Sequence, residues 1–321
     1  MKKVVLFGEC MIELKQGSAT QTVPMNMTQG FAGDVFNAAV YLKRWFADIQ
    51  TQMFTAVGDD EFSHNMKDYF LSEGINNDLL LTSNEKILGL YAIQTDDEGE
   101  RRFTYWRSDS AARYVMSLLT PDVIEQLKKA DLFFFSGISL AVILPEQRER
   151  FWQLIWELKE AGVKIAFDPN YRAKLWQSID ETKTQYDLAL QICDMVLPGI
   201  EDFQLIYDLQ TFEQVKSFCQ PYGIEEVVIK DGPNGVMVIE QNQTHFITIE
   251  AVENVVDTTS AGDSFNGAYI GARLSGKDIN DSVAIASATA GFVIQCPGAI
   301  VNIHDFDNYK DSFLSNIHGK T

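Results

Sequence analysis

Short apolar runs alternate with longer stretches of helical spacing along most of the 321-residue chain. The short runs are rich in β-branched and aromatic residues, which is typical of buried strands. Strands are predicted at residues 4–7, 52–56, 132–136, 164–167, 195–197 and 227–230. Helices are predicted at residues 35–45, 63–73, 147–161, 186–193, 202–207, 212–220, 263–275 and 280–295. The alternation predicts an α/β fold of three layers, with helices on both faces of a mostly parallel central sheet.

Two regions, residues 11–29 and 89–107, depart from this alternation. The first is rich in Gln, Thr and Ser and has no helical period. The second predicts two strands, 90–94 and 102–106, joined by the polar turn 96–99. We expect the two regions to form a small β-sheet lid on the α/β body. The sequence has no internal repeat and no Pro/Gly/Ser linker, so the whole chain is expected to form a single domain.

Composition and charge narrow the classes of function. The chain is 46% hydrophobic and 22% charged, which is typical of a soluble globular protein. Its formal net charge of -19 argues against nucleic acid and anionic membranes as partners, because both require a basic face. Four scattered cysteines without a C-x-x-C pair, and no apolar stretch long enough to cross a bilayer, indicate a cytoplasmic protein. An anionic small substrate would need local arginines, and Arg107 and Arg172 are candidates.

The most informative segment is 257–265, with the sequence Asp-Thr-Thr-Ser-Ala-Gly-Asp-Ser-Phe. It follows the apolar run 252–256, which predicts a strand, and it leads into the helix predicted from Asp263. A helix start of this kind offers free N–H groups and the positive end of the helix dipole to an anion. Helix capping would explain one or two of these residues. Two aspartates that bracket a run of small residues favour phosphoryl transfer to an alcohol, with Asp263 as the proton acceptor.

A second glycine-rich segment, residues 30–33, predicts a turn before the helix at 35–45. Asp34 and Asn37 are three residues apart, so they share the first helical turn and could both face a ligand. Side chains of this kind are what the buried hydroxyls of a polyhydroxy compound require. Asp34 could equally be a simple helix cap.

Two further segments follow predicted strands. Residues 168–172, Asp-Pro-Asn-Tyr-Arg, lie where ligands bind in open α/β sheets, and Asn170 and Arg172 could reach a phosphate or a carboxylate. Residues 230–235, Lys-Asp-Gly-Pro-Asn-Gly, let the backbone approach a nucleotide closely, although a β-hairpin turn would look much the same. The sequence contains no Walker A motif and no strand-linked G-x-G-x-x-G, which argues against a nicotinamide-dependent oxidoreductase.

The glycine-rich segment 30–37 and the segment 257–263, in this order, resemble the PfkB (ribokinase-like) carbohydrate kinase family over essentially the whole chain. The resemblance implies a ribokinase-like α/β/α fold and transfer of a phosphoryl group from Mg-ATP to a sugar. It implies that Asp263 is the base and that the amides of Ser260, Ala261 and Gly262 form the anion hole. The residues implied at the nucleotide are Asn170, Lys230, Gly232, Gly235, Asp257, Thr259 and Gly262, the aspartate and threonine also lining a monovalent cation such as K+.

Within that family, residues 33–37, 89–91, 105–107 and 170–176 resemble the subgroup that phosphorylates 2-keto-3-deoxygluconate (KDG) at its O6 hydroxyl. The implied substrate-binding residues are Gly33, Asp34, Asn37, Tyr91, Tyr105, Arg107, Arg172 and Asp263. KDG is a sugar acid, and the two arginines could hold its carboxylate. The implied product is 2-keto-3-deoxy-6-phosphogluconate.

One motif departs from the family pattern. Many members carry Pro-Asn-x-x-Glu, whereas this chain has Pro-Gly-Ile-Glu-Asp at 198–202. The resemblance therefore leaves Glu201 and Asp202 as candidates for holding Mg2+ through water. The sequence also leaves open a fructokinase- or ribokinase-type kinase, or a non-catalytic sugar- or nucleotide-binding protein. An exposed lid sheet could pair with a second copy of the chain to form a homo-oligomer.

Overall fold

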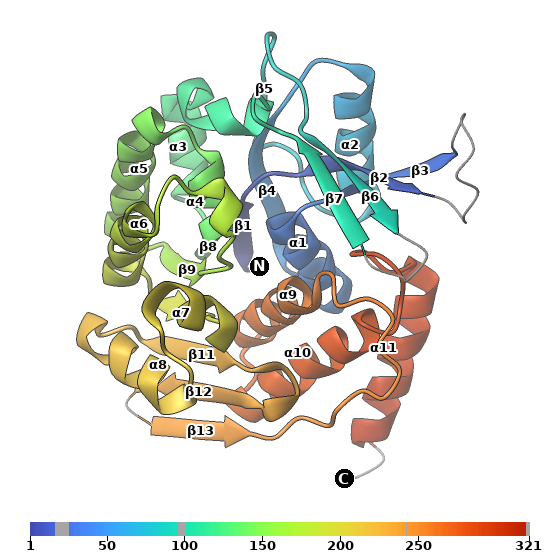
Figure 1. Ribbon diagram of the computed structural model, residues 1–321, viewed down its shortest axis with the longest axis vertical. Helices are drawn as coiled ribbons and strands as arrows, with labels where there is room; N and C mark the ends of the chain where they lie inside the picture. The colour runs from blue at the N-terminus through green and yellow to red at the C-terminus, as the bar shows by residue number, and fades with distance from the viewer. Residues whose placement is uncertain (17–25, 96–100, 242, 319–321) are drawn as a thin grey trace.

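A nine-stranded sheet forms the middle of the molecule (Figure 1). The computed structural model describes residues 1–16, 26–95, 101–241 and 243–318. The strands lie in the order β13 (Gln243–Ile247), β12 (Val236–Glu240), β11 (Glu226–Lys230), β10 (Met195–Val196), β9 (Lys164–Asp168), β8 (Leu132–Ser136), β1 (Lys3–Phe7), β4 (Gln50–Val57) and β5 (Leu80–Thr82). All neighbours from β5 to β11 pair in parallel, and β12 and β13 add an antiparallel edge. The predicted mostly parallel central sheet is confirmed.

Alternate residues of the central strands face two separate hydrophobic cores. In β1, Val5 and Phe7 join one core, whereas Val4 and Leu6 join the other. The first core packs against α3 (Pro121–Leu127), α4 (Gly137–Val142), α5 (Arg148–Glu160), α6 (Ile179–Ile192), α7 (Ile200–Tyr207) and α8 (Phe212–Cys219). The second packs against α1 (Asp34–Trp45), α2 (Glu61–Ser72), α9 (Ala261–Leu274), α10 (Ile279–Val293) and α11 (Ile303–His318). Both faces of the sheet are therefore covered, which gives the predicted three layers.

Short 3₁₀ segments supplement these helices. They are η1 (Ala111–Leu118), η2 (Pro145–Gln147), η3 (Ala173–Leu175), η4 (Gln220–Tyr222) and η5 (Gly232–Asn234). Within the ranges that the structure describes, no helix is long and apolar enough to cross a membrane.

A second, four-stranded sheet projects from the body (Figure 1). Its strands lie in the order β3 (Met27–Ala32), β2 (Met11–Gln16), β6 (Leu90–Thr95) and β7 (Arg101–Trp106). β2 pairs antiparallel with β3 and parallel with β6, which in turn pairs antiparallel with β7. The two segments that broke the sequence pattern thus contribute to one sheet. The predicted turn 96–99 and residues 17–25 lie outside the described residues.

Three local predictions require correction. The valine-rich segment 252–256, Val-Glu-Asn-Val-Val, is not a strand: β13 ends at Ile247, and residues 248–260 contain no helix or strand. Val256 and Asp257 instead donate their N–H groups to the carbonyl of Ile294, at 2.8 and 3.0 Å. The segment therefore lies beside the C-terminal end of α10. Gly30 lies within β3 and not in a turn, because β3 continues to Ala32. Helix α6 begins at Ile179, well before the predicted residue 186.

Helices α1 and α9 approach each other closely because glycine replaces a side chain at the contact. A Cβ atom built on Gly267 would lie 2.0 Å from the carbonyl oxygen of Ala38. One turn further along α9, a Cβ atom on Gly271 would lie 2.3 Å from the ring of Phe46. The two helices that carry Asp34 and Asp263 therefore pack almost backbone to backbone.

We expect Gly267→Ala to lower the free energy of unfolding by about 1–3 kcal/mol, because the new methyl group overlaps a backbone carbonyl that cannot move freely. Gly291→Ala in α10 is the matched control. Its Cβ would lie 3.2 Å from the flexible Val252 side chain, so helix propensity should leave stability unchanged or raised. Urea denaturation of both variants measures the difference. Equal stability of the two variants would contradict the proposed close contact.

Candidate active site

The candidate site lies where the carboxyl ends of the central strands meet the first turns of α1 and α9. Ligands of open α/β sheets bind at this edge. The polar side chains gathered there are Asp34 and Asn37 on α1, Ser136 at the end of β8, Asp168 and Asn170 at and after the end of β9, Lys230 at the end of β11, and Asp263 and Asn266 on α9.

Asp263 is held in the first turn of α9 by a hydrogen bond across to α1. The side-chain amide of Asn37 donates to Asp263 Oδ2 at 2.9 Å. Burial raises the pKa of Asp263 to about 7, and the neighbouring charges of Asp34 and Asp168 add to the rise. The Asn37 hydrogen bond and the charge of Arg172 oppose it. The side chain predicted to be a base is therefore poised to exchange a proton near neutral pH.

Asp34 also turns into the site. Ser136 Oγ donates to its Oδ2 at 2.5 Å and Asn170 Nδ2 donates to the same oxygen at 3.1 Å. Burial raises the pKa of Asp34. Gly33, not Asp34, occupies the N-cap position of α1, and no side chain caps that helix. A Cβ on Gly33 would lie 2.2 Å from the carbonyl oxygen of Glu9, which explains the glycine.

The start of α9 provides donors for an anion. Ser260 has a left-handed backbone, with φ 67°, and its buried Oγ has no hydrogen-bond partner in the described structure. The N–H group of Ala261 donates to the carbonyl of Thr258 at 3.2 Å. No hydrogen bond from the N–H groups of Gly262 or Asp263 occurs among the described residues, and the space beside Gly262 is open. Free amides at the positive end of a helix form an anion site.

Asp257 organises the turn that leads to this helix start. The side chain is buried. Its Oδ1 accepts from the N–H of Thr259 at 3.0 Å, and its Oδ2 accepts from the N–H of Gly298 at 2.6 Å. One carboxylate thus fixes the turn and ties it to the segment after α10.

Arg107 follows β7 of the small sheet, and its charge is already compensated. Its Nη2 forms an ion pair with the buried carboxylate of Glu9, which also accepts a hydrogen bond from Ser110 Oγ. The guanidinium of Arg107 lies 5.9 Å from the ring centroid of Tyr105. The ring centroids of Tyr105 and Tyr91 lie 5.7 Å apart. Glu9 was not among the site residues predicted from the sequence. The available signal was a charged residue directly after the apolar strand 4–7.

Arg172 and the two candidate metal ligands lie beside the loop after β9. Arg172 is exposed and donates from Nη1 to the carbonyl of Tyr171 at 2.8 Å. Asp202 accepts from the N–H of Tyr171 at 2.8 Å, and burial together with the charge of Asp168 raises the pKa of Asp202 to about 6. Glu201 is exposed. In the part of the chain that the structure describes, no group of three His, Cys, Asp or Glu side chains could hold a metal ion.

Lys230 ends β11 and directs its side chain inward. Its Nζ donates to Asn266 Oδ1 at 2.7 Å and lies 3.7 Å from Asp168 Oδ1. Asn266 Nδ2 in turn donates to Asp168 Oδ2 at 2.8 Å. The glycines after it, Gly232 and Gly235, have φ values of 49° and 119° in the hairpin that joins β11 to β12. The sequence analysis did not identify the roles of Asp168 and Asn266.

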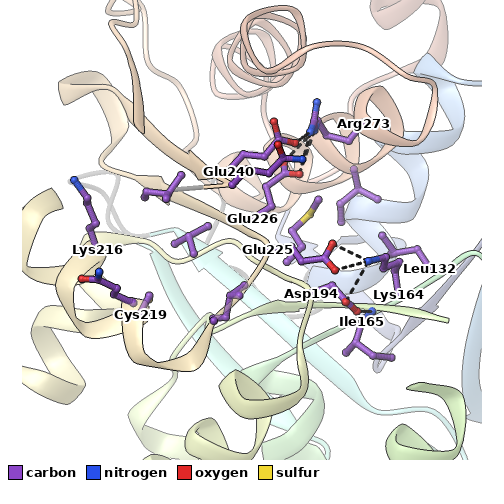
Figure 2. Close-up of a pocket in the computed structure, with 18 of the residues that line it drawn as sticks. Leu132, Lys164, Ile165, Asp194, Lys216, Cys219, Glu225, Glu226, Glu240 and Arg273 are labelled. Atoms are coloured by element: carbon purple, nitrogen blue, oxygen red, sulfur yellow. Dashed lines mark hydrogen bonds and ion pairs between the residues drawn. The ribbon is translucent and has the colours of Figure 1, made fainter. Parts of the chain in front are cut away.

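A cavity of about 810 Å³ lies at the opposite edge of the sheet (Figure 2). Leu132, Lys164, Met195 and Glu226, which begin their strands, are among its lining residues. Several of its charges are paired with one another, among them Lys164 with Glu225 at 2.7 Å and Arg273 with Glu226 at 3.0 Å (Figure 2). It shares none of the side chains gathered around Asp263, so it is not the candidate active site.

The fold and the site can be compared with known proteins. The model of the pfkB family carbohydrate kinases matches residues 1–305, and the chain belongs to this family. A 2-dehydro-3-deoxygluconokinase from Dickeya dadantii is 37% identical over 307 residues, covering 94% of this chain and 97% of that protein. One from Escherichia coli K12 is 36% identical with the same coverage. A fructokinase from Vibrio alginolyticus is 27% identical, and the alignment covers 90% of this chain and 89% of the fructokinase.

Solved structures show the same fold. A 2-dehydro-3-deoxygluconokinase from Thermotoga maritima has a TM-score of 0.81 and 22% identity, covering 96% of this chain and 98% of its own. A provisionally named ribokinase II from Escherichia coli, solved with ATP and Mg2+, has a TM-score of 0.82 and 20% identity, covering 97% and 100%. The ribokinase-like α/β fold expected from the sequence is therefore confirmed.

We expect one carboxyl group of the ligand-free protein to titrate near pH 7, because burial and neighbouring negative charges disfavour ionised Asp263. NMR titration of protein with ¹³C-labelled aspartate carboxyls measures this midpoint, and Asp263→Asn should abolish the signal. Asp34→Asn should move the midpoint to lower pH because it removes a negative charge. The matched control, Asp109→Asn, removes an exposed carboxylate paired with Lys86 and should leave the midpoint unchanged. A midpoint for Asp263 near pH 4 would contradict the expectation.

Proposed function

We propose that this protein is an ATP-dependent 2-keto-3-deoxygluconate kinase, which transfers the γ-phosphoryl group of ATP to the O6 hydroxyl of KDG. One observation carries the proposal: Asp263, with a pKa raised to about 7, lies in the first turn of α9, where the N–H groups of Gly262 and Asp263 make no hydrogen bond among the described residues. The 36–37% identity to several proteins named 2-dehydro-3-deoxygluconokinase supports the substrate.

In the proposed mechanism Asp263 accepts the proton of the O6 hydroxyl. As that proton leaves, O6 forms a bond to the γ-phosphorus and the bond from the γ-phosphorus to ADP breaks. The amides at the start of α9, predicted at Ser260, Ala261 and Gly262, stabilise the negative charge on the transferring oxygens. Bound Mg2+ would neutralise part of the charge of the phosphate groups. The hydrogen bond from Asn37 keeps the Asp263 carboxylate oriented towards the acceptor.

Substrate recognition is proposed to use both arginines in different ways. The ion pair with Glu9 leaves Arg107 as a fixed, directional donor with little net charge. Arg172 is exposed and supplies the positive charge for the carboxylate of KDG. The remaining proposed contacts to the sugar are Gly33, Asp34, Asn37, Tyr91 and Tyr105. The contact between the rings of the two tyrosines, which lie 5.7 Å apart and are tilted by 31°, supports a role in covering the substrate.

The nucleotide is proposed to lie along residues of three loops. The proposed contacts are Asn170, Lys230, Gly232, Gly235, Asp257, Thr259 and Gly262. Mg2+ commonly keeps several of its waters and is held through the phosphates of its nucleotide, so exposed Glu201 and half-buried Asp202 would contact it only through water. A monovalent cation such as K+ is proposed beside Asp257 and Thr259.

The small sheet is proposed to act as a lid on a single kinase domain, residues 1–321, and to pair with a second copy of the chain. β7 is an edge strand of this sheet, and its Phe103, Tyr105 and Trp106 side chains are 42%, 51% and 58% exposed. Exposed aromatic residues on an edge strand favour association. The net charge of -19 supports a protein that binds neither nucleic acid nor membranes, and a cytoplasmic location is proposed with it.

We expect ADP release with KDG to exceed that with 2-keto-3-deoxygalactonate, gluconate, fructose and ribose, because the site offers arginines to a carboxylate and a base to a terminal hydroxyl. Asp263→Asn should fold and bind ATP but lose about 10²–10⁴-fold in turnover, which is the usual contribution of a general base. A coupled assay of ADP release, run in K+ and in Na+, measures both. Faster turnover of fructose or ribose would favour the fructokinase or ribokinase alternative. Binding of sugar and ATP without turnover would favour the non-catalytic one.

Arg107→Ala should raise the KM for KDG by about 10- to 100-fold, as expected for loss of a hydrogen bond to a charged group. The KM for a neutral sugar that the enzyme accepts should change far less. Arg102→Ala is the matched control, because Arg102 is an exposed arginine on β7, the strand that Arg107 follows. Equal losses for acidic and neutral sugars would overturn the carboxylate assignment.

A further inference from the structure

Three side chains beside the first turn of α9 contact one another in a ring, and of these only Lys230 has a proposed role, as a contact to the nucleotide. Lys230 Nζ donates to Asn266 Oδ1 at 2.7 Å, Asn266 Nδ2 donates to Asp168 Oδ2 at 2.8 Å, and the two charged groups lie 3.7 Å apart. Each member comes from a different element: Asp168 ends β9, Lys230 ends β11, and Asn266 belongs to α9. The ring therefore joins two strands of the sheet to the helix that carries the proposed base.

The ring is buried, so its interactions are strong and specific in geometry. Asp168 is 5% exposed, Asn266 is 1% exposed, and the side chain of Lys230 is 14% exposed. A charge buried in this way is tolerated only when it is paired and hydrogen-bonded. An asparagine amide has one accepting oxygen and one donating nitrogen, and here each meets a partner of the correct kind. Rotation of α9 about its axis would break both hydrogen bonds.

Asn266 follows Asp263 by three residues, so the two side chains lie on the same side of α9. We propose that Asp168 and Lys230 are positioning residues for the phosphoryl transfer, which act through Asn266 to hold α9 in the rotation that directs Asp263 to the acceptor hydroxyl. This inference rests on the proposed function, because it takes Asp263 as the base. It also gives the Lys230 side chain a role other than contact with phosphate, while the turn 231–235 stays available to the nucleotide.

The charges around Asp263 make the inference testable by pH. Asp34 on α1, Asp168 at the end of β9 and Arg172 in the following loop all act on the charge of Asp263. Asp202 on α7, Asp34 and Lys230 face Asp168. Asp168 disfavours the ionised form of Asp263, and Lys230 offsets part of that effect. Removing either partner therefore changes the pH at which the base becomes active, in opposite directions.

The experiment compares pH profiles of kcat for Asp168→Asn and Lys230→Gln with that of the full-length wild-type enzyme, using KDG and ATP. Asp168→Asn should move the acid limb to lower pH, because a negative charge is lost. Lys230→Gln should move it to higher pH, because a positive charge is lost. The double variant Asp168→Asn/Lys230→Gln removes both buried charges, and it remains testable where a single variant fails to fold. The acid limb of the double variant should return towards the pH of the wild-type limb.

Asn266→Ala provides the positioning readout. It should lower kcat by about 10²-fold, as expected when a catalytic group is displaced by about 1 Å, and leave the KM for ATP unchanged. A raised KM for ATP in Lys230→Gln with an unmoved acid limb would overturn the inference, since it would mark Lys230 as a phosphate contact. The inference would also be overturned if the acid limbs of the two single variants stay at the wild-type pH, or if both move in the same direction. Activity in Asp263→Asn would instead overturn the proposed function itself.

Discussion

The close approach of α1 and α9 is the constraint on which the candidate site depends. Gly267 lies against the carbonyl of Ala38, so no side chain separates the two helices at that point. One turn nearer the start of α9, the same approach brings Asn37 within 2.9 Å of Asp263. The orientation of the proposed base therefore follows from the packing of two helices. The ring of Asp168, Asn266 and Lys230 adds a second attachment from the sheet side.

The electrostatics of the site are unusual for a protein that handles phosphate. Asp34, Asp168, Asp202 and Asp263 act on one another, and the pKa values of three of them are raised. Lysine often binds phosphate as a point charge, but the side chain of Lys230 is paired with Asp168 and hydrogen-bonded to Asn266. The polyanionic donor would therefore be received mainly by backbone amides and the dipole of α9. The same crowding of carboxylates keeps the proton affinity of Asp263 close to neutrality.

Much of the architecture could be predicted from the sequence, because strands buried on both faces appear as short apolar runs. The order of motifs also placed Asp34, Asn37, Asn170 and Asp263 in one site, and the structure brings them together. The run 252–256 misled because its valines are β-branched, although Val255 and Val256 are half exposed and pair with no strand in the described chain. Apolar identity does not specify burial when no neighbouring strand is available.

The site residues that were not predicted from the sequence were missed for a different reason. Glu9, Asp168 and Asn266 act through partners that are distant in sequence, such as Arg107 and Lys230. Spacing along the chain carries no record of these contacts. Arg107 illustrates the consequence: its residue type suggested contact with a substrate anion, whereas the structure pairs it with a carboxylate of the protein itself, Glu9.

The carboxylate of Asp257 affects when the site can form during synthesis of the chain. It joins the turn before α9 to Gly298, and Asn37 reaches across 226 residues to Asp263. During synthesis, which proceeds from the N-terminus, α1 and the strands from β1 to β10 emerge well before Asp263 and Gly298. The arrangement of charge around Asp263 therefore cannot exist on a nascent chain that still lacks its last helices. The contacts that hold Asp257 and Asp263 are therefore complete only once the chain has been synthesised as far as Gly298.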